Sequence, residues 1–178
     1  MSEPQPAAYR WNFRTDRLDV EHWRRRFDDD REMADVVIDI LSPAVTRFLP
    51  EPWRGDYTCA RAQRWIAERD RESALLIVLD RVSGNPVGFL VVAEDGKPPR
   101  GRELRIGFVI AEAAWGRGFA TELLAGFTHR CRAEGVSSLV GGAEARNSPS
   151  RRVLEKCGFR EDSSSATGDH CLYRLVLG

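Results

Sequence analysis

Two short stretches hold the residues of this chain whose types and spacing could do chemistry. The first, WGRGFA, runs from Trp115 to Ala120 and places two glycines where an apolar-periodic helix should begin. Glycine costs about 1 kcal/mol relative to alanine inside a helix, so its presence needs a reason. The unpaired N–H groups and the dipole of a helix start attract phosphate. Gly116 and Gly118 leave room for such an anion, although a tight turn before an ordinary helix explains the same letters.

The second stretch, NSPSRRVLEKCGF, lies about one strand later, from Asn147 to Phe159. It is typical of a short helix with Ser148 as a possible N-cap and Pro149 in the first helical position. Two common phosphate loops are excluded for the first stretch, because no Lys-Ser/Thr pair follows its glycines and its spacing is not GxGxxG after a first strand. Arg117 could add positive charge to that first stretch or project into solvent.

Hydrophobic periodicity predicts the elements that must position these stretches. The clearest is a strand over 102–111, with apolar residues from Leu104 to Ile110 on one side and Glu103, Arg105 and Gly107 on the other. A loose polar tail is expected over 1–10, a flexible loop over 161–169 and a single mixed α/β domain over 11–178. The expected order is strand, two helices, three strands, helix, strand, helix and strand, at 15–20, 28–43, 58–71, 74–80, 87–94, 102–111, 116–134, 137–144, 147–159 and 170–177.

Composition narrows the class of protein. Apolar residues make up 42% and charged residues 30%, as in a soluble globular protein. The 27 basic and 27 acidic residues balance, so no global charge draws the chain to nucleic acid or anionic lipid. No secretory signal opens the chain, and its aliphatic runs are too short to span a bilayer. Four cysteines without CxxC or histidine spacing indicate free thiols in a reducing cytoplasm: Cys59, Cys131, Cys157 and Cys171.

The joint order of the motifs resembles the GCN5-related N-acetyltransferase (GNAT) superfamily, and more closely its ribosomal-protein acetyltransferase-like (RimJ/RimL-type) branch. The residues that carry the resemblance are WGRGFATELL followed by N-x-x-S-x-x-x-L-E-K-x-G-F, with TDRL, SPAVTRFLP, GNPVGFL and LRIGFVI before them. The resemblance covers about residues 13–177. It implies one mixed sheet flanked by helices, with a splayed central strand pair, and acetyl-CoA as cosubstrate without a metal.

The resemblance also assigns roles to residues. Gly118 and Ala120 fill the last two positions of the family pattern Gln/Arg-x-x-Gly-x-Gly/Ala, and Trp115 stands where Gln or Arg is usual. Asn147 matches the residue that hydrogen-bonds the pantetheine arm, and Ser150 matches the serine that protonates the leaving thiolate. A turn asparagine and a first-turn helix serine remain the plainer interpretations. The implied cofactor set is Phe108, Val109, Ile110, Trp115, Gly116, Arg117, Gly118, Phe119, Ala120, Thr121, Asn147 and Ser150.

The chain departs from the family pattern at the group that would deprotonate the amine. The family often has a glutamate two residues before the glycine of IGF, and this chain has Arg105 there. Glu103, one pleat away on the same face, is the preferred base, acting through water, and Glu94 is the second choice. Either can instead be a solvated carboxylate. Arg105 then becomes a candidate for binding a carboxylate or phosphate on the acceptor.

The stretch FLPEPWRGDY, residues 48–57, resembles the region that walls the acceptor site, so Trp53 and Tyr57 are candidate acceptor contacts, although both suit plain packing. Deprotonating a lysine amine at neutral pH costs ~4–5 kcal/mol and an α-amine only ~1 kcal/mol, so a site without the usual glutamate suits the second. We expect an N-acetyltransferase that acts by direct attack in a ternary complex on a protein N-terminal α-amine or a small amine. It would work as a monomer or homodimer, with no nucleic-acid or membrane partner. The alternative is a non-catalytic acyl-CoA-binding sensor or interaction module.

Overall fold

The computed structural model describes residues 7–94, 102–162 and 169–178, and these form one mixed sheet of eight strands. Neighbouring strands are antiparallel except β5 and β6, which are parallel. The mixed α/β fold expected from the sequence is therefore confirmed. In sheet order the strands are β1 (Phe13–Arg14), β2 (Leu18–His22), β3 (Ala74–Asp80), β4 (Pro86–Glu94), β5 (Glu103–Ile110), β6 (Ser138–Glu144), β8 (His170–Val176) and β7 (Arg160–Glu161).

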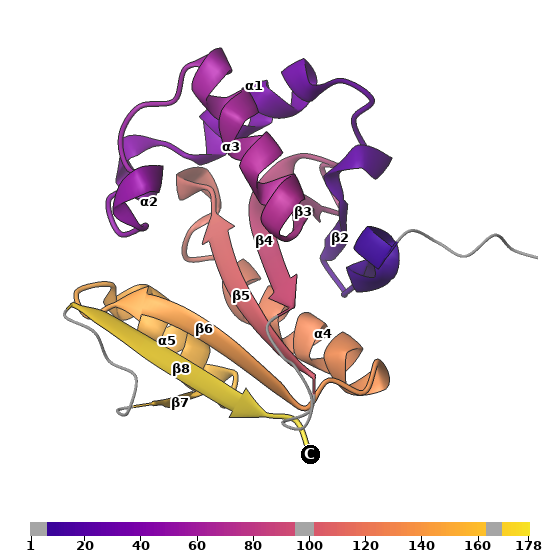
Figure 1. The fold of residues 1–178 in the computed structure, drawn as a ribbon, viewed down its shortest axis with the longest axis vertical. Coiled ribbons are helices and arrows are strands. Elements are labelled where there is room, and N and C mark those ends of the chain that lie inside the picture. The colour runs from indigo at the N-terminus through magenta and orange to yellow at the C-terminus, as the bar shows by residue number, and fades with distance from the viewer. Residues whose placement is uncertain (1–6, 95–101, 163–168) are drawn as a thin grey trace, which may run out of the picture.

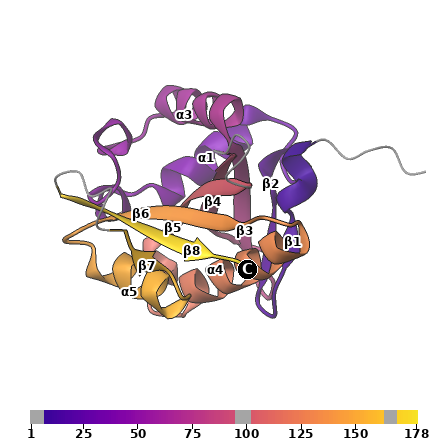
Figure 2. The same cartoon turned by 60° about the horizontal axis from the view of Figure 1, so that its bottom comes forward.

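Helices cover both faces of the sheet. Figure 2 shows α1 and α3 on one side of it and α4 and α5 on the other. The α-helices are α1 (Asp30–Ile40), α2 (Pro43–Thr46), α3 (Cys59–Glu72), α4 (Phe119–Ala133) and α5 (Ser148–Lys156). Short 3-10 helices are η1 (Ala7–Trp11), η2 (Trp23–Arg25), η3 (Glu51–Trp53) and η4 (Glu112–Ala114). Most of the loop expected over 161–169 lies outside the described residues, at 163–168.

The alternation along the strands creates two hydrophobic cores. The face of β5 that carries Leu104 and Ile106 packs with Phe127 of α4 and Leu154 of α5. The opposite face carries Val109, which packs in a second core with α1 and α3. The apolar stripe expected for the helix after WGRGFA comprises Ala120, Leu123, Leu124, Phe127 and Cys131. The last four are at most 1% exposed, whereas Ala120 is only partly buried.

Strands β5 and β6 are paired along only the first half of their length. Their parallel pairing runs from Glu103 opposite Ser138 to Ile106 opposite Gly141, and no pair is formed beyond it although both strands continue. Figure 1 shows the two strands diverging, with β4 and β5 on one arm and β6 and β8 on the other. The splayed central pair implied by the family resemblance is therefore present, and it opens a gap at the end of β5.

Three local expectations need revision. The helix expected from Gly116 begins at Phe119, because Gly116 (φ 73°) and Gly118 (φ 80°) take the left-handed conformation and form a loop. Asn147, not Ser148, is the N-cap of α5. The tail expected over 1–10 already forms η1 from Ala7, and Arg10 of η1 pairs with Glu134.

Candidate functional site

A cavity of about 490 Å³ lies at the place where the glycine loop, the free end of β5 and the start of α5 meet. Segments from both arms of the splayed sheet contribute to its wall. The lining residues are Ala44, Val45, Arg47, Phe48, Leu49, Phe108, Val109, Ile110, Ala114, Trp115, Gly116, Gly118, Phe119, Ala120, Thr121, Asn147, Pro149, Ser150, Arg152, Val153 and Lys156. Every residue of the predicted cofactor set lines this cavity except Arg117.

The glycine loop presents main chain to the cavity. Gly118 is the N-cap of α4 and provides no side chain to cap the first N–H groups of the helix. A Cβ at Gly116 would meet no atom within 4 Å, and one at Gly118 would meet only the tip of Arg17, at 3.5 Å. The glycines are therefore needed for their left-handed φ angles rather than to avoid crowding. N–H groups left uncapped at a helix start are donors of the kind that bind anions.

Strand β5 turns part of its main chain toward the gap beside it. The N–H of Ala111 donates to a carbonyl of β4 at 2.9 Å. Main-chain groups two residues apart in a strand point the same way, so Val109 also faces β4, while Phe108 and Ile110 face the gap. The indole Nε1 of Trp115 donates to the Ile110 carbonyl at 2.7 Å. The N–H of Ile110 and the main chain of Phe108 are thus directed toward the gap.

Asn147 and Ser150 are brought together at the start of α5. The Asn147 side-chain oxygen accepts a hydrogen bond from the Ser150 N–H at 3.2 Å, which fixes the first turn of the helix. This cap is the structural role that an asparagine takes at a helix start. Both residues also line the cavity, so capping does not remove them from the site.

Arg117 points away from the cavity that its loop lines. Its guanidinium donates to the Asp80 carboxylate at 3.0 Å and stacks on the Phe119 ring at 4.4 Å from the centroid. Asp80 is itself buried, with a side chain 7% exposed. The Val82 backbone hydrogen bond, opposed by burial and helped by Arg117, lowers the pKa of Asp80. The side chain of Arg117 therefore anchors the loop.

The two carboxylates proposed as bases lie outside the cavity lining. Glu103 accepts a hydrogen bond from the Ser138 hydroxyl at 2.7 Å and pairs with Arg174. It begins β5, and at about 3.3 Å per residue it is roughly 20 Å along the strand from Ile110. Glu94 pairs with Arg102. Arg105 is exposed and does not line the cavity either.

The two aromatic residues proposed as acceptor contacts hold the segment after α2 in place. Trp53 packs edge-on against Trp65 of α3, with ring centroids 5.5 Å apart, and Arg69 lies over its ring at 4.6 Å. The Tyr57 hydroxyl donates to the Trp53 carbonyl at 3.1 Å. Neither residue lines the cavity. These packing contacts account for the positions of both aromatic residues.

Sequence reasoning missed a group of cavity residues with a clear chemical character. Arg152 and Lys156 lie four residues apart on α5, and Arg47, the C-cap of α2, lines the same cavity. Their i, i+4 spacing in SRRVLEK was a usable signal, because such residues share one helix face. Phe48 and Leu49 add an apolar wall from a segment far away in sequence.

One further carboxylate, Glu144, connects β6 to the segment after α2. Glu144 ends β6, three residues beyond the last pair with β5, and its side chain is 12% exposed. It pairs with Arg54, which also donates to the carbonyl of the cavity residue Leu49 at 2.7 Å. The Asn147 N–H donates to the Glu144 carbonyl at 2.9 Å. Glu144 is therefore adjacent to the cavity without lining it.

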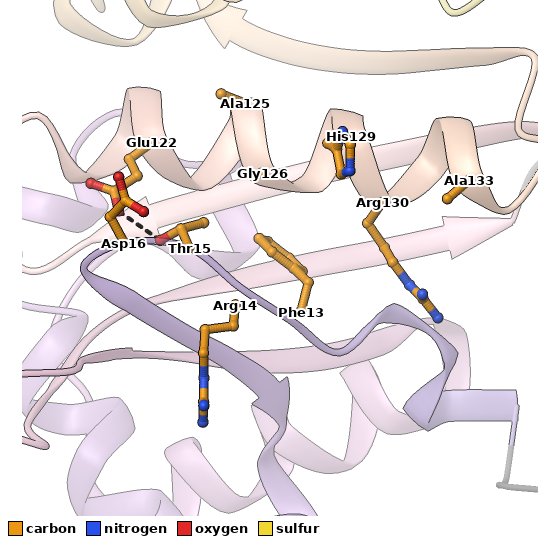
Figure 3. A pocket seen from close by; sticks show the side chains of 10 residues that line it. All are labelled: Phe13, Arg14, Thr15, Asp16, Glu122, Ala125, Gly126, His129, Arg130 and Ala133. Carbon is orange, nitrogen blue, oxygen red and sulfur yellow. Dashed lines mark hydrogen bonds between the residues drawn. The ribbon is translucent and has the colours of Figure 1, made fainter.

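A second, more open hollow of about 430 Å³ lies between the β1 segment and α4 (Figure 3). Phe13 and Thr15 face Gly126 across it, and a Cβ on Gly126 would come within 2.5 Å of Thr15. None of the predicted site residues lines it. In the part of the chain that the structure describes, no cluster of His, Cys, Asp and Glu could hold a metal, and no helix is long and apolar enough to cross a membrane.

Many solved structures share this fold, and three of them illustrate the likeness. An acetyltransferase of the GNAT family from Bacillus anthracis is 17% identical, with a TM-score of 0.74, covering 93% of this chain and 98% of its own. The ribosomal-protein-S5-alanine acetyltransferase from Vibrio fischeri is 14% identical, with a TM-score of 0.67, covering 93% and 96%. The yncA protein from Salmonella typhimurium, described as an acetyltransferase and solved with its cofactor acetyl-CoA, is 18% identical, with a TM-score of 0.63, covering 92% and 95%.

The sequence itself matches a family. No curated protein matches the chain. Residues 17–160 match the acetyltransferase (GNAT) domain, a span that includes the glycine loop, all of β5 and β6 and the capped start of α5. The matched span is well over half of the 178 residues. The chain therefore belongs to the acetyltransferase (GNAT) domain family.

Proposed function

We propose that this protein is an acetyl-CoA-dependent N-acetyltransferase that transfers the acetyl group directly to a primary amine. The observation that carries the proposal is the cavity in which an uncapped, glycine-lined helix start meets the unpaired end of β5 and the Asn147–Ser150 pair. A helix start suits a diphosphate. The gap beside β5 suits an extended amide-containing arm, because an unpaired strand edge binds extended chains through main-chain hydrogen bonds.

The residues present fit the charge of coenzyme A. The amides of the loop over 116–121 would bind its diphosphate, and Asn147 would bind the pantetheine arm. Arg47, Arg152 and Lys156 give the cavity three cations for the phosphates, and no carboxylate from the described residues lines it. Such an uncompensated cationic lining favours a polyanionic ligand.

The chemistry needs few protein groups. The bound cosubstrate supplies an acetyl thioester that an amine can attack. The Ile110 N–H, directed at the gap, would donate to the thioester oxygen as negative charge develops there, a contribution commonly worth ~3–4 kcal/mol. Ser150 would donate a proton to the departing thiolate. No covalent intermediate on the protein is needed.

The acceptor that fits best is an α-amine. Glu103 is remote from the cavity and already paired, so it has little support as the base, and the site depends on an amine that loses its proton easily. An α-amine does so at a cost of ~1 kcal/mol near neutral pH. The likeness in fold to an S5-alanine acetyltransferase supports a RimJ/RimL-like protein acceptor, and small amines remain in the proposal. We propose Glu144 as the anion that binds the acceptor ammonium, in exchange for Arg54.

We place the reaction in the cytoplasm, because the cysteines are free thiols and reduced thiols suit that compartment.

One observation favours the alternative of a non-catalytic acyl-CoA-binding module: among the described residues no carboxylate that could act as a base lines the cavity. Such a module would bind the same ligand without turnover.

A single assay separates the two. Purified protein is incubated with acetyl-CoA and a panel of peptides and small amines. Control peptides carry acetylated lysine ε-amines, so that only their α-amine can react. Thiol release and the mass of the acceptor are followed together. Release of CoA with a mass gain of one acetyl group on an acceptor supports the enzyme. CoA binding by calorimetry without turnover on any acceptor supports the module. Absence of CoA binding contradicts both.

A further inference from the structure

The peptide between Arg117 and Gly118 decides what the glycine loop presents to the cavity. In a trans peptide the C=O of Arg117 and the N–H of Gly118 point in opposite directions. Glycine populates positive and negative φ about equally, so this peptide can rotate at little steric cost. Once rotated, it would present a carbonyl oxygen, instead of an N–H, to a bound anion. Something in the structure must hold it in one orientation.

Arg17 holds this peptide from behind the loop. Its Nη1 donates to the Arg117 carbonyl at 2.9 Å, and its guanidinium lies over the ring of Phe119, 4.9 Å from the centroid. Gly118 lines the cavity and Arg17 does not. Because the Arg117 carbonyl points to Arg17, the N–H of Gly118 points to the other side of the peptide, away from Arg17.

Glu122, in the first turn of α4, fixes Arg17 in turn. Its Oε2 accepts from the Arg17 Nε at 2.6 Å, and its Oε1 accepts from the Arg17 backbone N–H at 2.8 Å and from the Thr15 hydroxyl at 2.6 Å. Figure 3 shows Glu122 and Thr15 pointing toward one another between α4 and the turn after β1. Burial would raise the pKa of Glu122, but the hydrogen bonds from Thr15 and Arg17 outweigh it and lower that pKa, so the carboxylate stays charged at neutral pH.

Arg117 is also anchored through its side chain, which pairs with Asp80 at the end of β3. We propose that Arg17 and Glu122 are positioning residues that keep the Gly118 N–H aimed into the cavity by holding the Arg117 carbonyl. The loop then meets a diphosphate without having to reorganise. The ligand rests on the proposed function, whereas the orientation of the peptide can be tested without any ligand.

The test without ligand uses NMR of the free protein. Wild type should show one sharp Gly118 amide signal, because one peptide orientation is populated. Arg17→Ala and Glu122→Gln should broaden or double that signal through exchange between two orientations. Arg14→Ala is the matched control: it removes an arginine and its pair with Asp19 from the same hairpin, and neither touches the loop. An unchanged Gly118 signal in both variants overturns the proposal.

The test with ligand uses NMR titrations with CoA and with pantetheine, which lacks the diphosphate. Arg17→Ala and Glu122→Gln should weaken CoA binding about tenfold, the size expected for a lost hydrogen bond to a charged group, and leave pantetheine binding unchanged. Arg17→Lys should behave like Arg17→Ala, because an ammonium lacks the fork that bonds Glu122 and the Arg117 carbonyl together. Equal weakening for both ligands, or full rescue by lysine, overturns the proposal. If wild type ignores CoA, the proposed function fails, and the Gly118 signal still decides the role of Arg17.

Discussion

At the scale of the residue, the proposed acid role of Ser150 can be separated from its place in a helix turn. Ser150→Ala should lower kcat by about 10²-fold, as loss of general acid–base help does, and leave the CoA dissociation constant unchanged. Ser148→Ala is the control, because Ser148 is exposed in the same turn and does not line the cavity. Steady-state kinetics and calorimetry measure the two constants, and wild-type kcat for Ser150→Ala would remove the acid role.

We predict opposite kinetic effects of neutralising the two carboxylates Glu103 and Glu144. Glu144→Gln should raise the acceptor KM at least about tenfold, because a charged partner for the ammonium is lost. Glu103→Gln should leave KM and kcat close to wild type, since its contacts are with Ser138 and Arg174 at the other end of β5. Both variants are assayed with the best acceptor peptide. Loss of activity only in Glu103→Gln would restore Glu103 as the base and remove Glu144 from the acceptor site.

The same pair shows where sequence reasoning stops at this scale. The family pattern pointed to β5 and so to Glu103. The alternation of apolar and polar residues along this strand placed Glu103 on the face opposite Leu104 and Ile106. Nothing local marks Glu144, because its position beside the cavity depends on β6 diverging from β5 and on Arg54, which lies 90 residues away in the chain. The pairing of Arg117 with Asp80 could not be anticipated for a similar reason, since Asp80 is distant in sequence.

At the scale of the element, the glycine loop before α4 offers a matched pair of substitutions. Gly118 (φ 80°) and Gly135 (φ 69°) flank the same helix, and neither would crowd a Cβ. Gly118→Ala and Gly135→Ala should each lower the free energy of unfolding by about 1–2 kcal/mol, the cost of a left-handed L-residue. Only Gly118→Ala should also lose the rise in Tm that CoA gives wild type, because only the loop before α4 is proposed to hold the diphosphate. Equal CoA protection in both variants would contradict the loop assignment.

Elements with strong periodicity were predicted well, and their ends were not. The strand at 102–111 became β5 (Glu103–Ile110), and the run at 58–71 became α3 (Cys59–Glu72). The start of α4 was placed early because glycine marks a helix boundary without fixing its side. The short β1 and β7 strands escaped notice, since a two-residue strand carries no alternation and exists only through its partner.

At the scale of the whole molecule, the stability should fall in two steps as the pH is lowered. His22 is 5% exposed, and burial, opposed by Asp70 and assisted by Arg24, lowers its pKa below 6.5. A histidine whose pKa is lowered by folding contributes stability above its unfolded pKa, and this is lost as the pH falls below 6.5. Glu122 contributes above its unfolded pKa near 4.5, and that contribution is lost as the pH falls below it.

Melting curves from pH 8 to pH 3.5 test both steps, because the slope of Tm against pH follows the number of protons taken up on unfolding. Wild type should begin to lose Tm near pH 6.5 and decline further below about 4.5, the unfolded values of the two groups. His22→Gln should abolish the first decline and keep the second. Glu122→Gln should keep the first decline and reduce the second, because Asp80 and Glu134 also have lowered pKa values. A wild-type Tm that stays level from pH 7 to pH 5 would show that folding does not lower the pKa of His22. Since Glu122 also holds Arg17, the second decline should be accompanied by a loss of CoA affinity. Such a loss would connect the acid limit of the fold to the loop that we propose binds the diphosphate.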